Sequence, residues 1–125
     1  MNEDELSNKI IGIAIDVHRA LGPGLLETVY KECLFYKLKQ EGFAVEKEKE
    51  LPVIFEDVRI DCGYRLDLLV EGKVVLELKS VKALDDTHLA QTLTYLKLGK
   101  FKLGLLINFN TAVLRDGIRR VVNGL

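Results

Sequence analysis

Apolar residues recur at helical spacing in three parts of the chain, each bounded by residues that start or stop helices. The first predicted helix covers about residues 6–21 and ends at Gly22-Pro23, the second covers 26–40 and ends at Gly42, and the third covers 87–98 and ends at Gly99. Asp85 and Asp86 are candidate N-caps for the third helix. These three segments therefore predict helices separated by short connections.

The rest of the chain alternates or is continuously apolar, as strands do. Strands are predicted over residues 45–51, 53–55, 74–79, 103–107 and 117–122. A longer strand is predicted over residues 58–70, and it includes Asp67. The strand over 45–51 is densely charged and is predicted to be an exposed edge strand. Two helices, then strands, a helix and further strands predict one α/β (α+β) domain over residues 1–125. Its mixed sheet is expected to be flanked by helices on both faces.

The stretch from Tyr64 to Lys79 predicts a hairpin, and its loop length decides which side chains share a face. With a two-residue loop, the apolar positions of the two strands would lie on opposite sides of the sheet, because a one-residue slip flips every side chain. One extra loop residue, permitted by Gly72, joins the leucine-rich faces and places Asp67 with Val75, Glu77 and Lys79. We therefore predict an odd loop.

Asp67, Glu77 and Lys79 would then place two carboxylates and an ammonium close together. Two acids on rigid strands suit Mg²⁺, which prefers oxygen ligands. A lysine beside the ion can orient a water molecule or neutralise developing charge. The alternative is an ordinary solvated face with a Glu–Lys pair, and the spacing by itself favours that alternative.

Composition excludes several classes of protein. The chain has 125 residues, 48% of them hydrophobic and 30% charged, which excludes disorder and fits a globular domain. The net charge of −1 excludes a strongly basic nucleic-acid coat. Cys33 and Cys62 lack metal-ligand spacing and are expected to be buried, reduced thiols. Without a signal peptide or a long apolar run, a cytoplasmic protein is expected.

Five other polar residues have ordinary structural explanations. His18 is expected at the surface, because no residue with ligand spacing accompanies it. Glu27 stands in the first turn of the second helix, where the helix dipole stabilises an acid, and Tyr30 follows on the same face. Gln91 and Tyr95 lie on a polar face of the third helix and are explained as exposed polar surface.

Four motifs in this order nevertheless resemble the GxxExxY family, a group placed in the PD-(D/E)XK nuclease superfamily. They are HRALGPGLLETVY (His18 to Tyr30), YRLDLLV (Tyr64 to Val70), ELKS (Glu77 to Ser80) and QTLTYL (Gln91 to Leu96). The resemblance covers nearly the whole chain, from Ile10 to Asn123. It implies a restriction-endonuclease-like core. The proline that often precedes the superfamily's aspartate is replaced here by Leu66.

The resemblance also implies roles for individual residues. Asp67 and Glu77 match the two metal-binding acids, and Lys79 matches the lysine that places or activates the attacking water. The backbone carbonyl of Leu78 commonly completes the metal's oxygen ligands. The other implied positions are an additional acid near the metal, Glu27, and substrate-contacting residues on the helices, Gln91, Tyr95 and Tyr30.

Three functions follow as hypotheses. The first is a nuclease that hydrolyses phosphodiester bonds with Mg²⁺ or Mn²⁺, with DNA favoured over RNA, as a monomer or as a homodimer whose two sites meet two strands. The second is a non-catalytic nucleic-acid-binding or assembly module that retains the fold, which the small size and near-neutral charge favour. The third and weakest is a metal-dependent hydrolase of a small phosphorylated substrate.

Overall fold

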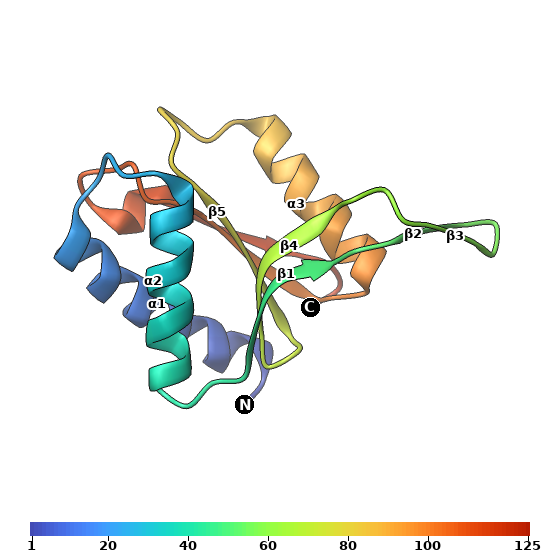
Figure 1. Cartoon of the computed structure of the whole chain (residues 1–125), viewed down its shortest axis with the longest axis horizontal. Helices are drawn as coiled ribbons and strands as arrows, with labels where there is room; N and C mark the ends of the chain where they lie inside the picture. The colour runs from blue at the N-terminus through green and yellow to red at the C-terminus, as the bar shows by residue number, and fades with distance from the viewer.

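The computed structural model describes all residues, 1–125, and contains three α-helices, seven strands and one short 3₁₀ helix (Figure 1). The helices are α1 (Glu3–Leu21), α2 (Glu27–Gln40), α3 (Asp86–Gly99) and the 3₁₀ helix η1 (Leu114–Gly117). The strands are β1 (Val45–Glu50), β2 (Val53–Phe55), β3 (Val58–Ile60), β4 (Arg65–Val70), β5 (Val74–Lys79), β6 (Leu103–Asn108) and β7 (Ile118–Val122). The three predicted helices are confirmed, with ends that differ by a few residues.

Five strands form a mixed sheet in the order β1-β4-β5-β6-β7. β5 and β6 are parallel and are joined through α3, whereas the other neighbours are antiparallel. A parallel pair needs such a crossover, because its second strand must start at the same end of the sheet. β1 is an edge strand, as its charged sequence predicts, and the final strand β7 is also confirmed.

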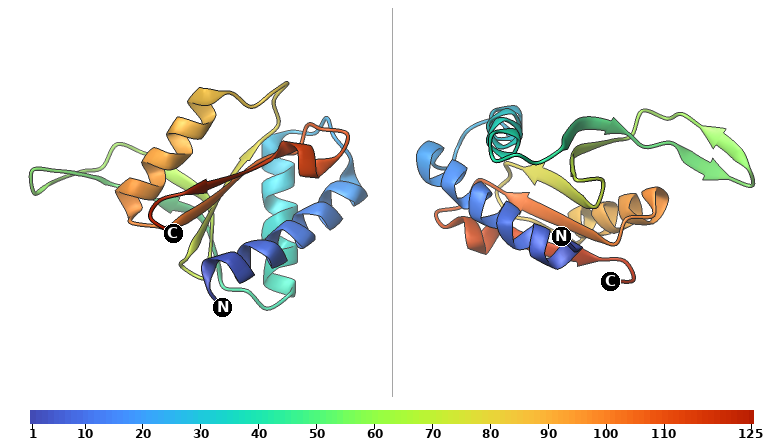
Figure 2. Two further views of the ribbon diagram at one scale, coloured as in Figure 1. Left: turned by 180° about the vertical axis from the view of Figure 1, so that it is seen from behind. Right: turned by 90° about the horizontal axis from the view of Figure 1, so that it is seen from below.

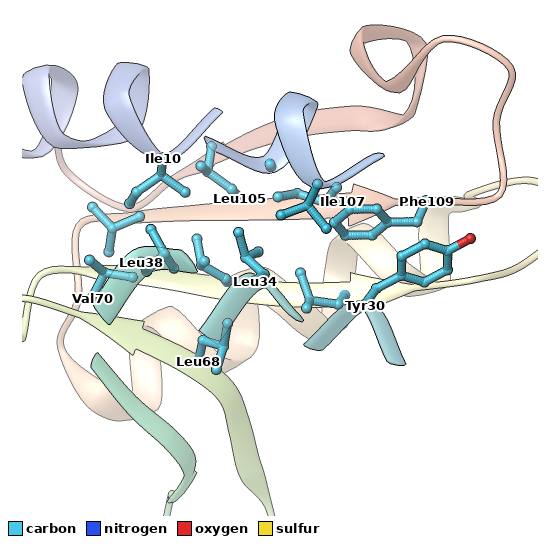
Figure 3. Packing of buried hydrophobic residues seen from close by; sticks show 14 of the residues in the cluster. Ile10, Tyr30, Leu34, Leu38, Leu68, Val70, Leu105, Ile107 and Phe109 are labelled. Atoms are coloured by element: carbon cyan, nitrogen blue, oxygen red, sulfur yellow. The ribbon is translucent and has the colours of Figure 1, made fainter. Parts of the chain in front are cut away.

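Helices cover both faces of this sheet, as predicted (Figures 1 and 2). α1 and α2 pack on one face over a core that includes Ile10, Leu34 and Leu105, and here Tyr30 stacks on Phe109 with ring centroids 4.5 Å apart (Figure 3). α3 covers the other face over a smaller core. The residues of this second core are Leu51, Leu66, Leu69, Val75, Tyr95, Leu96 and Val121.

The predicted long strand from residue 58 to 70 is wrong. It divides at Gly63, which has φ +81°, into β3 and β4, and these belong to different sheets. β2 and β3 form a separate two-stranded ribbon that projects from the body of the molecule (Figures 1 and 2). Glycine permits this left-handed backbone at little cost, so the chain turns there from the ribbon into the main sheet.

Two expectations about single side chains are also wrong. His18 is buried, and its Nε2 atom lies 2.9 Å from the carbonyl oxygen of Thr111, so the ring joins α1 to the segment before η1. Both cysteines are free, but Cys33 is only half-buried and Cys62 is exposed. No helix in the fold combines the length and apolar character that a membrane span requires.

Candidate functional site

The hairpin of β4 and β5 has the odd loop that the sequence predicts. Val70 pairs with Val74, so Glu71, Gly72 and Lys73 form a three-residue connection in which Gly72 has φ +65°. The same register pairs Leu68 with Leu76 and makes Asp67 and Glu77 the next opposing positions. Joining the apolar faces thus brings the two acids together, because side-chain direction along both strands follows from this one register.

The alternation of β4 is interrupted at Asp67, which the sequence does not predict. Leu66 and Leu69 pack in the same core although they are three residues apart. The pairing of β1 with β4 also omits Glu48 and Asp67, and Glu48 has φ +53°, a conformation uncommon outside glycine. Sheet pairing is therefore disturbed around Asp67, and such local strain is often found at functional sites.

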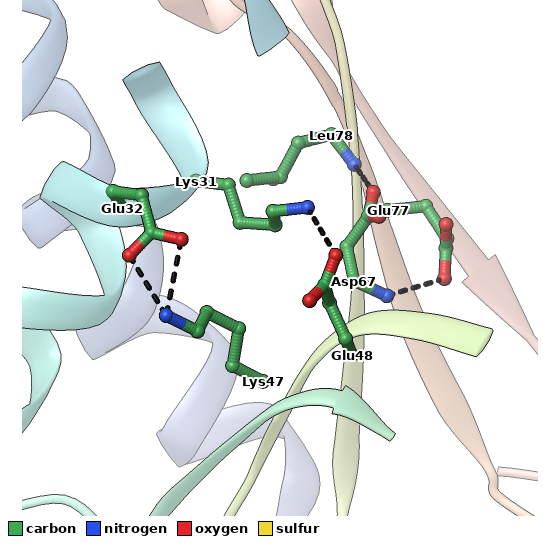
Figure 4. A network of polar contacts seen from close by, with 7 residues as sticks. All are labelled: Lys31, Glu32, Lys47, Glu48, Asp67, Glu77 and Leu78. Atoms are coloured by element: carbon green, nitrogen blue, oxygen red, sulfur yellow. Dashed lines mark hydrogen bonds and ion pairs between the residues drawn. The ribbon is translucent and has the colours of Figure 1, made fainter. Parts of the chain in front are cut away.

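Asp67 and Glu77 are held by the backbone of the opposite strand (Figure 4). The backbone N–H of Leu78 donates to Oδ2 of Asp67 over 2.8 Å, and the N–H of Asp67 donates to Oε1 of Glu77 over 3.3 Å. Each carboxylate thus accepts a hydrogen bond where regular strand pairing would continue. Asp67 is half-buried, whereas Glu77 retains only 5% of its exposure.

The environment of Glu77 disfavours its negative charge. Burial is the largest cause and the neighbouring Asp67 the second, and together they raise the pKa of Glu77 from 4.5 to about 9. The hydrogen bond from the Asp67 backbone and the charge of Lys79 lower this pKa, but they do not balance the first two effects. The acid pair therefore lacks positive charge, which a divalent cation would supply.

Lys79 and Tyr95 lie close enough to Glu77 for electrostatic interaction, and Gln91 contacts Tyr95. Lys79 is half-buried and close enough for its charge to act on Glu77. Burial raises the pKa of Tyr95, and the nearby Glu77 adds to the shift, so the phenol of α3 faces the acids. Gln91 donates a 3.1 Å hydrogen bond to the Tyr95 hydroxyl. Gln91 is exposed, whereas Tyr95 is buried, so the expectation of exposed surface holds only for Gln91.

Three further residues border the site and were not singled out from the sequence. Lys31 of α2 forms an ion pair of 3.1 Å with Glu48, beside the acid pair (Figure 4). The ring of Tyr64 lies 5.7 Å from that of Tyr95 and is partly exposed. Tyr64 belongs to the same motif as Asp67, and this shared motif could have identified it from the sequence as a residue near the site. Lys31 and Glu48 carry no local signal, because only packing brings α2 beside β1.

Glu27 does not join Asp67 and Glu77 in a three-acid cluster, and Tyr30 is buried away from solvent. Glu27 is exposed in the first turn of α2. No group of three or more histidine, cysteine, aspartate or glutamate side chains is arranged to hold a metal ion. Asp67 and Glu77 alone provide the clustered acidic oxygens. Their chemistry suits a hard divalent cation, since both carboxylates offer oxygens and a cation would favour the ionised form of Glu77, which the protein alone disfavours.

Tyr30 has a structural role instead of the expected contact with substrate. Its side chain is fully buried, and its hydroxyl donates to the Gly22 carbonyl over 2.6 Å and accepts from the Leu25 N–H over 3.1 Å. The hydroxyl thus fixes the loop between α1 and α2, and its complete burial keeps it out of reach of a substrate. This is the physical reason that the substrate-binding interpretation of Tyr30 is wrong.

We expect Tyr30→Phe to lower the free energy of unfolding by about 1–3 kcal/mol, because two backbone groups lose their hydrogen-bond partner. Urea denaturation followed by circular dichroism measures this change. Tyr36→Phe is the matched control on the same helix, since Tyr36 is exposed and its hydroxyl accepts only a long hydrogen bond of 3.4 Å from Gln40. Equal midpoints for both variants would contradict the role given to Tyr30.

Comparison with known proteins supports the motif assignment at the level of a superfamily. A family model described as the PD-(D/E)XK nuclease superfamily matches residues 4–121, almost the entire chain. No curated protein and no solved structure matches the chain significantly. The matched region includes every residue of the site described above, and nucleases of this superfamily typically use divalent metal ions.

Proposed function

The chain belongs to the PD-(D/E)XK nuclease superfamily, and from this premise we propose that it is a metal-dependent phosphodiesterase acting on nucleic acid, with DNA as the favoured substrate. The motif from Gly24 to Tyr30 supports placing it more narrowly in the GxxExxY family. The superfamily supports a nuclease-like function, whereas the metal, the substrate and the roles of individual residues are the proposal.

One observation carries this proposal: the pair of half-buried Asp67 and buried Glu77, whose carboxylates accept hydrogen bonds across β4 and β5. Without a cation, ionising both acids is costly, because burial and the neighbouring charge of Asp67 oppose the ionisation of Glu77. Mg²⁺ or Mn²⁺ held by these two carboxylates would polarise a phosphoryl oxygen and lower the pKa of a bound water. The structure thus supports a site that is most stable with a cation present.

Lys79 is proposed to hold the attacking water. Its ammonium acts on Glu77 from the same end of β5, so it can donate a hydrogen bond to a water beside the acid pair. It also offsets negative charge that develops on a phosphoryl oxygen. Lys79 therefore has an electrostatic role that depends on its position relative to the carboxylates.

The Leu78 carbonyl is proposed as a further oxygen ligand, and Glu27 as an additional acid near the metal, outside the acid pair. The Leu78 N–H points toward β4 and Asp67, and in antiparallel strands the N–H and C=O of one residue face the same neighbour. The loop before Glu27 is tied to the end of β5 by a 2.6 Å hydrogen bond from Ser80 to the carbonyl of Leu25. This contact supports a position for Glu27 at the rim of the site, on the side of Lys79.

Gln91 and Tyr95 are proposed to contact the substrate from α3. Gln91 is exposed and already bonded to the Tyr95 hydroxyl, so the two side chains form one polar unit beside the acids. An amide and a phenol can donate to phosphate or sugar oxygens without reading sequence. This arrangement would position the backbone of a nucleic acid against the acid pair.

The decisive experiment compares cleavage by the protein and by Asp67→Ala. We expect purified protein to cut DNA in Mg²⁺ or Mn²⁺, to lose activity in EDTA, and to lose at least about a hundredfold in rate in Asp67→Ala. RNA of the same sequence is tested in parallel. Asp16→Ala is the matched control, because Asp16 is exposed on α1, which packs on the opposite face from α3. Equal cleavage by all three proteins would indicate a contaminating nuclease.

The alternative is a non-catalytic module that binds nucleic acid through the same fold, and the near-neutral net charge of −1 favours it. Binding that persists in EDTA, weakens with salt and is not followed by cleavage would support this alternative. The same titration, read by fluorescence anisotropy with labelled DNA, distinguishes the two functions. A nuclease is expected to bind more tightly in Ca²⁺ than in EDTA, because a cation at the acid pair removes repulsion of the phosphates.

A further inference from the structure

The ribbon of β2 and β3 exposes one entirely apolar face. Val53 pairs with Ile60 and Phe55 with Val58, so these four side chains lie on one side of the ribbon. Phe55 is 62% exposed and Val58 58% exposed. An isolated two-stranded hairpin is at best marginally stable in water, and this one projects away from the sheet and helices (Figures 1 and 2). The apolar face therefore requires a partner that the monomer does not supply.

The charges of the ribbon argue against nucleic acid as this partner. Its tip is formed by Glu56 and Asp57, two exposed acids that take part in no ion pair. The only basic side chain of the ribbon, Arg59, is paired with Asp61 at 3.1 Å. Phosphates would be repelled by such a tip. The partner should instead combine an apolar surface with free positive charge.

Such a surface exists at the opposite end of the same chain. A pocket of about 260 Å³ lies between the end of α1 and η1, and its apolar wall includes Ile15, Val113 and Leu114. Arg19 and Arg115 also line it, and no carboxylate does. Neither arginine forms an ion pair within the monomer. The pocket thus matches the tip in both apolar character and charge.

We propose that the ribbon tip of one copy of this chain docks in the pocket of a second copy. The ribbon and η1 lie at opposite ends of the molecule in all three views, so a tip cannot reach its own pocket (Figures 1 and 2). Two copies side by side in opposite directions form both contacts, which closes a dimer with twofold symmetry. Phe55 and Val58 beside each tip are then covered, and the two tip acids face the two arginines. This inference does not depend on nuclease activity.

Charge reversal tests the pairing of these two surfaces. Sedimentation velocity over a dilution series measures the dimer dissociation constant of the protein. We expect Glu56→Lys with Asp57→Lys, and separately Arg19→Glu with Arg115→Glu, to raise that constant by at least about tenfold, the effect of losing one close charge pair. Mixing the two variants should restore the dimer, because a lysine tip then meets a glutamate pocket and an unchanged tip meets an unchanged pocket.

Matched controls separate this contact from general effects on folding. Lys97→Glu reverses a charge in the last turn of α3, as Arg19→Glu does in α1, and should leave the dimer unchanged. Phe55→Ser should weaken the dimer, whereas Ile54→Ser should not, because Ile54 is 57% exposed but pairs with Arg59 on the other face. Thermal melts followed by circular dichroism confirm that each variant is folded.

Several results would overturn the proposal. A protein that stays monomeric at every concentration would do so. A dimer whose dissociation constant is unchanged in Arg19→Glu with Arg115→Glu would also do so, because the copies would then associate through their ribbons or through another face. Failure of the mixed variants to associate would exclude the tip-to-pocket contact. A monomer whose Arg19→Glu, Arg115→Glu variant loses affinity for DNA would reassign the pocket to nucleic acid.

Discussion

Glu77→Gln is expected to stabilise the protein in EDTA at neutral and alkaline pH while abolishing cleavage. The pKa of Glu77 is about 9 in the folded state and 4.5 without its neighbours, so folding takes up a proton between these two values. The contribution of Glu77 to the free energy of unfolding is therefore fully present below pH 4.5. It falls as the pH rises towards 9, by up to about 1.4 kcal/mol per pH unit. Glutamine cannot ionise, so the variant lacks this loss.

Urea denaturation at several pH values measures the effect. We expect the difference between variant and parent to be small near pH 4 and to reach several kcal/mol near pH 8. Glu50→Gln is the control, because Glu50 is exposed on the edge strand β1 of the same sheet and its variant should follow the parent. Parallel curves for Glu77→Gln and the parent would show that Glu77 is not held in a buried, uncompensated pair.

Added Mg²⁺ or Mn²⁺ extends the same measurement. A cation bound at the acid pair requires ionised carboxylates, so binding is coupled to loss of the Glu77 proton. We expect the metal to raise the unfolding midpoint of the parent most strongly above neutral pH, and to have little effect on Glu77→Gln. A metal effect of equal size on both proteins would place the ion elsewhere.

Lys79→Met is expected to lower the cleavage rate by about a hundred- to ten-thousandfold, the range for removing a group that stabilises charge or moves a proton at the reacting centre. Methionine retains much of the length and apolar stem of the lysine, so packing near β6 is preserved. Single-turnover cleavage in Mg²⁺ measures the rate. Lys82→Met is the matched control, because Lys82 is exposed three residues further along the chain.

Comparing Lys79→Met with Lys79→Arg separates the effect of the positive charge from the effect of where the donor group lies. Lys79→Arg retains the positive charge, but its planar group cannot place the same single donor, so we expect only partial recovery of the rate. Binding of DNA in Ca²⁺ should change much less than cleavage in both variants. A lysine that only holds substrate would instead show a large loss of binding with a nearly unchanged single-turnover rate at saturating protein.

Much of the site could be predicted from local pattern because its geometry follows from one hairpin. Apolar alternation in β4 and β5 required an odd loop, and that loop places Asp67 opposite Glu77. The interruption at Asp67 could not be predicted in this way. Leu66 packs in the core under α3, and the residues with left-handed backbone on either side of this disturbance, Glu48 on β1 and Gly63 before β4, lie outside the hairpin.

The errors share a physical cause. The spacing predicts His18 and Tyr95 as polar surface positions, and the motif resemblance implies a substrate contact for Tyr30, but the burial of all three depends on elements distant in the chain. His18 contacts Thr111, and Tyr30 stacks on Phe109. Helical spacing shows which side chains share a face, but it does not show what covers that face. A polar group that packs against a distant element therefore looks like a surface residue in the sequence.

The sequence by itself determined the helices, the edge character of β1, the loop of the β4–β5 hairpin and the candidate acids, because each depends on residues close together in the chain. Only the tertiary structure decided that Glu77 is buried, that Lys31 and Glu48 border the site, and that the β2–β3 ribbon stands apart. These properties depend on which distant surfaces meet. Burial then sets the charge of Glu77, and so the proposed chemistry depends on packing that no local pattern records.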